Sequence, residues 1–244
     1  MNSCHRLALR LKVVAMSEEP ICATYSVFKP GSIKDRLVFR ARRRLYEVMR
    51  SLVPLDEMRS ILDVGATSDR TCKSSNYFER MIDNPERITA FSDQDASWMC
   101  DEWKGLRFVR GDARDMPFAD NSFDFVFSSA VIEHVGSREQ QHQFLKECVR
   151  VARKHVFITT PNRWYPLEMH SGLPLLHWLP MPWFRGILRL VGKGGLAKES
   201  NLNLLSPREF NAICNRLEVE DKEFHFLRFF GFKSNIMLHI RKAQ

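Results

Sequence analysis

The sequence predicts a doubly wound α/β domain, because short apolar runs typical of buried strands alternate with segments of helical periodicity. Three of these runs are the clearest. Ser60 to Gly65 closes with a glycine, Arg107 to Arg110 is followed by Gly111-Asp112, and Phe123 to Ser128 ends in serines. Ligands of an open α/β sheet bind at the carboxyl ends of its parallel strands, so we expect a site where these runs end.

The remaining elements follow in the alternation that right-handed βαβ units require. Apolar residues at mainly helical spacing between Asp35 and Leu52 predict a helix that leads into the domain. Ser206-Pro207 predicts a helix start, with serine as N-cap and proline at the first helical position. The other expected helices are 72–82, 95–101 and 137–153, and the other expected strands are 87–92, 155–160, 217–226 and 235–241, the last two pairing as an antiparallel edge.

The chain contains no internal repeat and no low-complexity linker, so we expect one domain. It runs from residue 35 to 244 and follows a partly flexible N-terminal extension, residues 1–34, in which Met16 is an alternative start. Between Trp164 and Ser200 the alternation of elements stops, and four prolines and three tryptophans crowd the segment. A loop of this length in a compact domain is usually functional, so we expect a lid insertion over residues 164–200 that covers or lines a binding site.

The composition, 44% hydrophobic and 27% charged, is that of an ordinary globular protein. Six cysteines are scattered without a CxxC pair, so we expect no zinc cluster, no other metal site and no disulfide framework, and a cytoplasmic location. No apolar run approaches the roughly 20 residues that cross a bilayer. The first 16 residues are interrupted by Arg10 and Lys12, which is poor for a signal-peptide core.

The net charge of +8 is unevenly distributed. Seven lysines and arginines lie between Lys29 and Arg44, against one acid, Asp35. Such a cluster could meet the phosphates of RNA, anionic lipid headgroups or a charged sugar. The alternative is a solvated helix face, the usual state of a charge run, and the sequence leaves both open.

Three motifs carry a resemblance to a known family. They are ILDVG, the stretch from Arg107 to Val135 (RFVRGDARDMPFADNSFDFVFSSAVIEHV), and a fifth strand ending in TTPN. Together they resemble the class I S-adenosylmethionine-dependent methyltransferases with a type 11 methyltransferase domain, over residues 58–163. The resemblance implies a Rossmann-like sheet of seven strands in the methyltransferase order, with the last strand antiparallel, and S-adenosylmethionine as cofactor. One motif departs from the family: the usual GxGxG is Gly65-Ala66-Thr67-Ser68-Asp69.

The resemblance also implies where the cofactor lies. Gly65 brings the backbone close to the methionine part, since glycine adopts dihedrals that other residues avoid. Asp93 accepts hydrogen bonds from both ribose hydroxyls, and Asp112 lies beside the adenine amino group. Asp63 orients the loop or meets the cofactor's amino group, and a buried acid capping the loop would look the same. The full set of expected cofactor-binding residues is Asp63, Gly65, Ala66, Asp93, Gly111, Asp112, Ala113 and Ser128.

Methyl transfer from a sulfonium is an in-line displacement, so the protein supplies alignment and, for a hydroxyl acceptor, a base. His134 is the first candidate for that base, with Glu133 beside it and His170 entering from the insertion together with Glu168. A structural role such as a satisfied hydrogen bond is the alternative for each. The aromatic residues of the insertion could form the wall of an acceptor site, lie on a membrane surface, or cover the sheet edge.

The expected function is therefore methyl transfer at O, N or C to a small molecule or a lipid- or carbohydrate-linked acceptor, such as an envelope component, with peripheral contact to a membrane or another anionic surface. Methylation of nucleic-acid bases is disfavoured on two grounds. The fourth strand does not end in the [DN]PP[YF] by which methyltransferases of the adenine amino group resemble one another. Methylation of cytosine at C5 needs a cysteine nucleophile near the same cleft, whereas Cys148 lies within a predicted helix. The alternatives are an RNA methyltransferase using the helix of residues 35–50, and a non-catalytic relative with a degenerate first motif. A nicotinamide oxidoreductase would need GxGxxG after the first strand.

Overall fold

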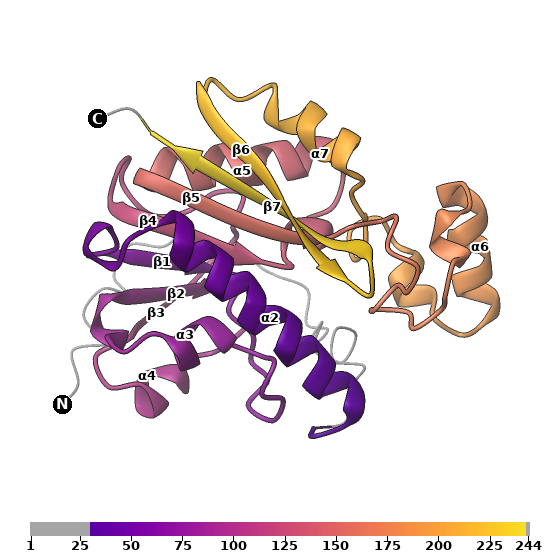
Figure 1. Cartoon of the computed structure of the whole chain (residues 1–244), viewed down its shortest axis with the longest axis horizontal. Helices are drawn as coiled ribbons and strands as arrows, with labels where there is room; N and C mark the ends of the chain where they lie inside the picture. The colour runs from indigo at the N-terminus through magenta and orange to yellow at the C-terminus, as the bar shows by residue number, and fades with distance from the viewer. Residues whose placement is uncertain (1–29, 243–244) are drawn as a thin grey trace.

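The computed structural model describes residues 30–242, so Met16 and most of the predicted extension lie outside the described residues. Within them the chain forms one seven-stranded sheet in the order β3-β2-β1-β4-β5-β7-β6 (Figure 1). The strands are β1 (Ile61–Val64), β2 (Ile88–Ser92), β3 (Arg107–Arg110), β4 (Phe123–Ser129), β5 (Ala152–Pro161), β6 (Asp221–Phe229) and β7 (Phe232–Arg241). Strands β1 to β5 pair in parallel, and β7 runs antiparallel to both β5 and β6. The predicted sheet is confirmed.

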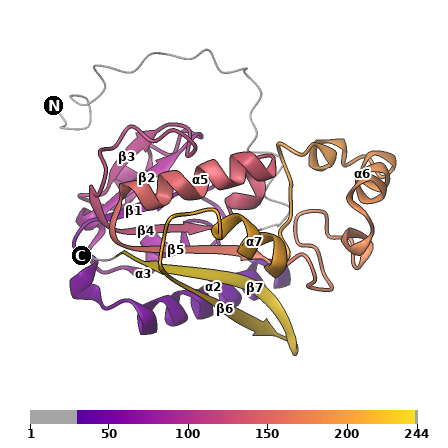
Figure 2. The same ribbon diagram turned by 90° about the horizontal axis from the view of Figure 1, so that it is seen from above.

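Helices cover both faces of the sheet, as a doubly wound fold requires: α2 and α3 lie on one face, α5 and α7 on the other (Figure 2). The helices are α2 (Ile33–Leu52), α3 (Tyr77–Met81), α4 (Met99–Glu102), α5 (Arg138–Val151), α6 (Met181–Leu190) and α7 (Pro207–Cys214). Capping boxes begin α5 at Ser137 and α7 at Ser206. The helix expected over 72–82 is shorter than predicted, because Asn76 takes a left-handed conformation with φ 47° and α3 begins after it.

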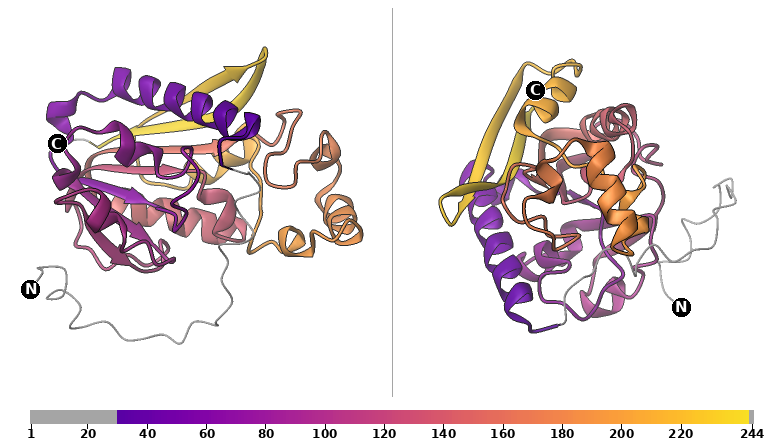
Figure 3. Two further views of the ribbon diagram at one scale, coloured as in Figure 1. Left: turned by 90° about the horizontal axis from the view of Figure 1, so that it is seen from below. Right: turned by 90° about the vertical axis from the view of Figure 1, so that its right-hand side faces the viewer.

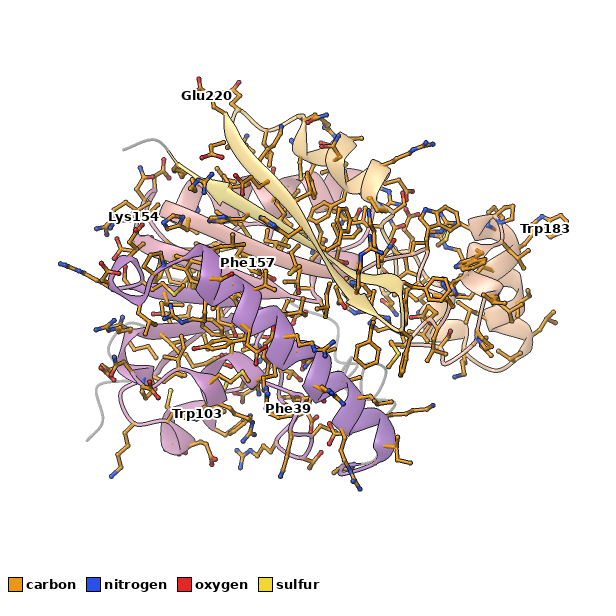
Figure 4. The ribbon with its side chains drawn as sticks, viewed as in Figure 1. Phe39, Trp103, Lys154, Phe157, Trp183 and Glu220 are labelled. Carbon is orange, nitrogen blue, oxygen red and sulfur yellow. The ribbon has the colours of Figure 1, made fainter. Side chains whose placement is uncertain are left out.

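The core is divided by the sheet, because successive strand residues point to opposite faces. Phe125, Phe127 and Phe157 are buried against α2 and α3, and Figure 4 shows Phe157 beneath α2. Phe78 of α3 stacks on Phe127 with ring centroids 4.2 Å apart. Neighbouring strand residues such as Val126 pack into the cluster on the side of α5 and α7.

The segment predicted as a lid is not an open loop. It holds α6 and two 3₁₀-helices, Leu176–Trp178 and Gly194–Ala197, and it projects from the end of the sheet domain (Figures 1 and 3). Phe184 and Leu188 are fully buried in a small apolar core of its own. Two of the four prolines, Pro180 and Pro182, lie where α6 begins, and proline fits the first turn of a helix. Among residues 30–242 no helix is long and apolar enough to cross a membrane.

Candidate active site

Two glycine turns lie at the carboxyl ends of neighbouring strands. Gly65 follows β1 with φ +100°, and its N–H donates to the Phe91 carbonyl at 2.8 Å. A Cβ on Gly65 would lie 2.1 Å from Cγ2 of Val131, so no side chain fits there. Gly111 follows β3, and its N–H donates to the Ser92 carbonyl at 2.9 Å. A Cβ added to Gly111 would lie only 2.7 Å from the Phe91 ring. Both turns therefore require glycine, and both lie at the predicted ligand edge.

The glycine-poor loop after Gly65 is held by side chains. Asn76 accepts a hydrogen bond from the Thr67 N–H at 2.9 Å and donates one to the Thr67 carbonyl at 2.8 Å. The Ser68 N–H and hydroxyl both donate to Oε1 of Gln94, at 3.3 and 3.1 Å. Sequence reasoning missed Asn76, although asparagine is one of the few residues that adopts its left-handed conformation readily. These hydrogen bonds fix the conformation of the loop in a chain that lacks the later glycines of the family motif.

We expect Asn76→Ala to weaken binding of S-adenosylmethionine about tenfold and to lower the free energy of unfolding by about 1–2 kcal/mol, because two hydrogen bonds to the loop backbone are lost. Calorimetric titration and urea unfolding measure the two effects. Asn84→Ala, before the 3₁₀-helix Pro85–Arg87, is the matched control, since Asn84 makes no side-chain cap. Equal affinity of Asn76→Ala and wild type would show that the loop does not depend on this clamp.

Asp63 of β1 and Glu79 of α3 form a buried acidic pair. Burial and the neighbouring Glu79 raise the pKa of Asp63 well above its ordinary value of 3.8, and Arg42 offsets this only in part. Burial likewise raises the pKa of Glu79. Both carboxyl groups therefore resist ionisation in the folded state. This arrangement supports the loop-orienting role of Asp63, while its contact with the cofactor stays a prediction.

Glu79→Gln is expected to stabilise the fold increasingly as pH rises from 5 to 8, by about 1 kcal/mol at pH 8. Both carboxyl groups have higher pKa values in the folded state than in the unfolded state. Their contribution to the free energy of unfolding is therefore complete at a pH below the unfolded-state pKa values and is lost as pH rises through the folded-state pKa values. An amide at position 79 removes one buried charge and can donate to Asp63. Urea unfolding at three pH values measures the effect, with the exposed Glu86→Gln as control. A difference that does not change with pH would contradict it.

Two exposed acids mark the ends of β2 and β3. Partial loss of hydration and the charge of Asp112 raise the pKa of Asp93. Partial burial also opposes ionisation of Asp112, but hydrogen bonds from Arg114, the shortest 2.6 Å, outweigh it and lower the pKa of Asp112. Two carboxylates on adjacent strand ends fit an adenosine, since each offers two acceptor oxygens to hydroxyl or amino groups.

The other expected cofactor residues contribute by packing. Ser128 is fully buried, and its hydroxyl donates to the Val64 carbonyl at 2.8 Å, tying β4 to β1. Ala66 is buried beside the turn after β1, and Ala113 packs against the core below the turn after β3. Any contact of these three with the cofactor remains a prediction.

A second cluster, after β4, brings together the three expected catalytic residues. Glu133 and His134 lie in the 3₁₀-helix Ile132–His134 after β4, and His170 reaches them from the insertion. Nε2 of His134 lies 3.1 Å from Nε2 of His170. Nδ1 of His170 contacts Oε1 of Glu168 at 2.7 Å, and Nδ1 of His134 contacts the Asn201 carbonyl at 2.6 Å. The sequence named these residues, and the tertiary fold places them in contact.

Burial and its neighbour His170 lower the pKa of His134 to about 3, so His134 is neutral. Burial disfavours a charge on His170, but the Glu168 carboxylate outweighs this and raises the pKa of His170. Burial would raise the pKa of Glu168, yet the contacts with His170 and Ser171 lower it to about 2. The Glu168 carboxylate therefore favours a proton on His170, whose ring lies against the neutral imidazole of His134.

Arg42 and Tyr77 also belong to this site, and sequence reasoning missed both roles. The Arg42 guanidinium lies 5.3 Å from the centroid of the Tyr77 ring and donates to the Ser74 carbonyl. The Tyr77 hydroxyl lies 3.1 Å from Oγ of Ser129, at the end of β4. Arg42 is spaced seven residues from the buried Asp35 and Met49, a signal that it shares their inward face. The remaining basic side chains of α2 that the structure shows exposed are Lys34, Arg36, Arg40, Arg43 and Arg44.

The tryptophans of the insertion are largely on the surface. Trp164, Trp178 and Trp183 are 48%, 41% and 69% exposed. Trp183 lies at the outer end of the projecting segment and points away from the sheet (Figure 4). It therefore takes no part in a wall around the strand-end residues.

Residues 62–159 match the methyltransferase domain family. Over these residues the chain contains a methyltransferase domain, and the strand order of its sheet is that of the class I methyltransferase fold. The ajmaline N-methyltransferase of Rauvolfia serpentina is 33% identical over 104 residues, which are 41% of this chain and 34% of that protein. The matched residues make up 34% of that protein and 23% of a putative methyltransferase of Encephalitozoon cuniculi, so the chain spans about a quarter to a third of the length of these two relatives.

Solved structures share the methyltransferase fold. A SAM-dependent methyltransferase from Aquifex aeolicus superposes with a TM-score of 0.53 at 16% identity, covering 81% of this chain and 88% of that one. The N-methyltransferase NodS from Bradyrhizobium japonicum, in complex with S-adenosyl-L-homocysteine, gives a TM-score of 0.51 at 11% identity, over 83% of this chain and 87% of NodS. These likenesses show the fold. S-adenosylmethionine is the cofactor of this class, and the strand-end residues fit it.

Proposed function

We propose that this chain transfers a methyl group from S-adenosylmethionine to a small molecule or to a lipid- or carbohydrate-linked acceptor. One observation carries the proposal: the fold sets the His134–His170 contact at the same edge of the sheet as the glycine turns and acids expected to hold the cofactor. A cofactor side and an acceptor side next to each other are what in-line methyl transfer needs.

Each group has a defined task in this proposal. The cofactor supplies a methyl group on a positively charged sulfur. Gly65 lets the backbone approach the methionine part, while Asp93 and Asp112 bind the adenosine. His134, His170 and Glu133 lie where the acceptor would enter, so they would orient its nucleophilic atom and take up its proton. Glu168 holds the ring of His170 in place through Nδ1.

A lipid-linked acceptor is supported by the surface of the insertion. Leu190 and Trp183 of α6 are 87% and 69% exposed, with Arg189 on the same short helix. Apolar side chains beside a basic residue suit a membrane interface. The helix proposed for RNA binding instead turns Arg42 into the site, which leaves only its outer face for phosphates.

Titration with S-adenosylmethionine tests the proposal. Wild type is expected to bind with 1:1 stoichiometry, and Asp93→Ala and Asp112→Ala to bind about tenfold or more weakly, since each loses hydrogen bonds to the adenosine. Asp56→Ala, an exposed acid far from these strand ends in sequence, is the control. Unchanged affinity in both variants would overturn the cofactor site, and folded wild type that does not bind the cofactor would favour the non-catalytic alternative.

A further inference from the structure

The candidate catalytic residues also form a cluster of possible metal ligands: Glu133, His134 and His170. One ligand atom from each, a carboxylate oxygen and two imidazole nitrogens, lies within 4.8 Å of the others. Glu133 is fully buried, and the side chain of His170 is only 12% exposed. The sequence named the three residues as candidates for a base, and the fold brings their ligand atoms together.

The hydrogen bonds of the two histidines leave their Nε2 atoms facing each other. Nδ1 of His134 contacts a carbonyl oxygen, which can only accept, so this nitrogen carries the proton. Nδ1 of His170 contacts the Glu168 carboxylate in the same way. In the neutral forms both Nε2 atoms then present lone pairs, 3.1 Å apart. Two facing lone pairs need a proton or a metal cation between them.

The distance between the two Nε2 atoms suits a metal ion bound to both. With Zn–N bonds of about 2.05 Å, two nitrogens 3.1 Å apart subtend an angle of about 98° at the ion. That angle lies between the octahedral and tetrahedral values. The distance therefore matches two adjacent ligands of one ion as well as it matches a hydrogen bond.

The surroundings resemble those of a built metal site. Oε1 of Glu133 is buried and has no hydrogen-bond partner among residues 30–242, while Oε2 is held by the Thr160 hydroxyl at 2.9 Å. Each histidine is oriented through its other nitrogen, by Glu168 or by the Asn201 carbonyl. Such outer contacts are the usual support of metal-ligating histidines and carboxylates. The unpartnered oxygen is the one available for a cation.

We propose that Glu133, His134 and His170 bind one divalent transition-metal ion. Two imidazoles and one carboxylate favour zinc, manganese, cobalt or iron over magnesium, which prefers oxygen ligands. Two carboxylates supply negative charge at the cluster: Glu133 itself, and Glu168, whose Oε1 lies 2.7 Å from Nδ1 of His170. Three protein ligands leave a position open for another molecule.

The role of the ion, though not its binding, rests on the function proposed above. A divalent ion lowers the pKa of a bound hydroxyl, so the acceptor class would be a hydroxyl compound. In the transfer, the acceptor oxygen forms a bond to the methyl carbon. The carbon–sulfur bond breaks and its electron pair stays on sulfur. The hydroxyl proton passes to water, because the bound ion occupies the side chains that would otherwise take it up.

Cobalt(II) titration tests the binding directly. Tag-free full chain is stripped with EDTA, dialysed and titrated with CoCl₂, with visible absorption and calorimetry as readouts, and MnCl₂ and ZnCl₂ follow. We expect one ion per chain in wild type, at least a roughly 100-fold loss of affinity in Glu133→Gln and His170→Gln, and a 10- to 100-fold loss in Glu168→Gln, which removes an outer contact. His225→Gln, on β6, is the matched control and should bind like wild type.

Two results would overturn the proposal: no stoichiometric binding of any of the three ions by folded wild type, or equal binding by His170→Gln and wild type. Circular dichroism checks the fold of each variant. Because Glu133 is buried, His170→Gln in the insertion keeps the test decisive if Glu133→Gln does not fold. Titration of the same preparation with S-adenosylmethionine separates the two proposals, since cofactor binding without metal binding defeats only this one.

Discussion

Gly65→Ala is expected to lower the free energy of unfolding by about 3 kcal/mol, combining positive-φ strain with overpacking against the core. Gly65 has φ +100°, a conformation that residues with a Cβ avoid. The added methyl would also fall 2.1 Å from Cγ2 of Val131. Movement of the turn should weaken S-adenosylmethionine binding by about 100-fold, which corresponds to ~2.7 kcal/mol. Urea unfolding and calorimetric titration measure the two effects.

Two further variants separate strain from clash. Val131→Ala removes the opposing methyl groups, so the double variant Gly65→Ala/Val131→Ala should recover about 1–2 kcal/mol relative to the sum of the single changes. Gly231→Ala is the matched control, because Gly231 also has positive φ but has nothing within 4 Å of a Cβ. It should lose stability only through strain and should leave cofactor affinity unchanged. Additive effects of Gly65→Ala and Val131→Ala would contradict the clash.

Arg150→Ala is expected to lower the free energy of unfolding by about 2–3 kcal/mol. The change removes the charged partner of Glu147 and leaves two backbone carbonyls without a hydrogen-bond donor. Arg150 of α5 binds Glu147 at 2.7 Å and Asp120 at 2.8 Å, and donates to the carbonyls of Phe118 and Met116. Glu147, which is 6% exposed, would keep its charge without this partner. Urea unfolding measures the loss.

The same change should also weaken cofactor binding several-fold, since Arg150 fixes the loop that continues from the turn at Gly111 and Asp112. Arg150→Lys keeps the charge but not the planar fork of donors, so an intermediate loss is expected. Arg216→Ala provides the control: Arg216 pairs with Glu139 in an exposed bridge that contributes less than about 1 kcal/mol. A loss for Arg150→Ala no larger than for Arg216→Ala would show that the loop does not depend on this network.

Much of the fold could be predicted because its signals are local. A buried strand such as β1 appears as an apolar run, and α7 begins at Ser206-Pro207, as the sequence predicted. The predicted helix over 72–82 was wrong in length because the dihedrals of Asn76 depend on hydrogen bonds to the distant loop at Thr67. The helix α6 was missed because prolines in its first turn look like loop residues.

The sequence by itself determined the sheet, its ligand edge and the residue types available there, since strand periodicity and glycine turns are properties of short segments. Only the tertiary structure decided which of these meet. His170 contacts His134 across 36 residues, and Arg42 reaches Tyr77 from the helix before the sheet. Such contacts depend on how separate segments pack, because burial, charge and tautomer are set by neighbours that spacing along the chain does not specify.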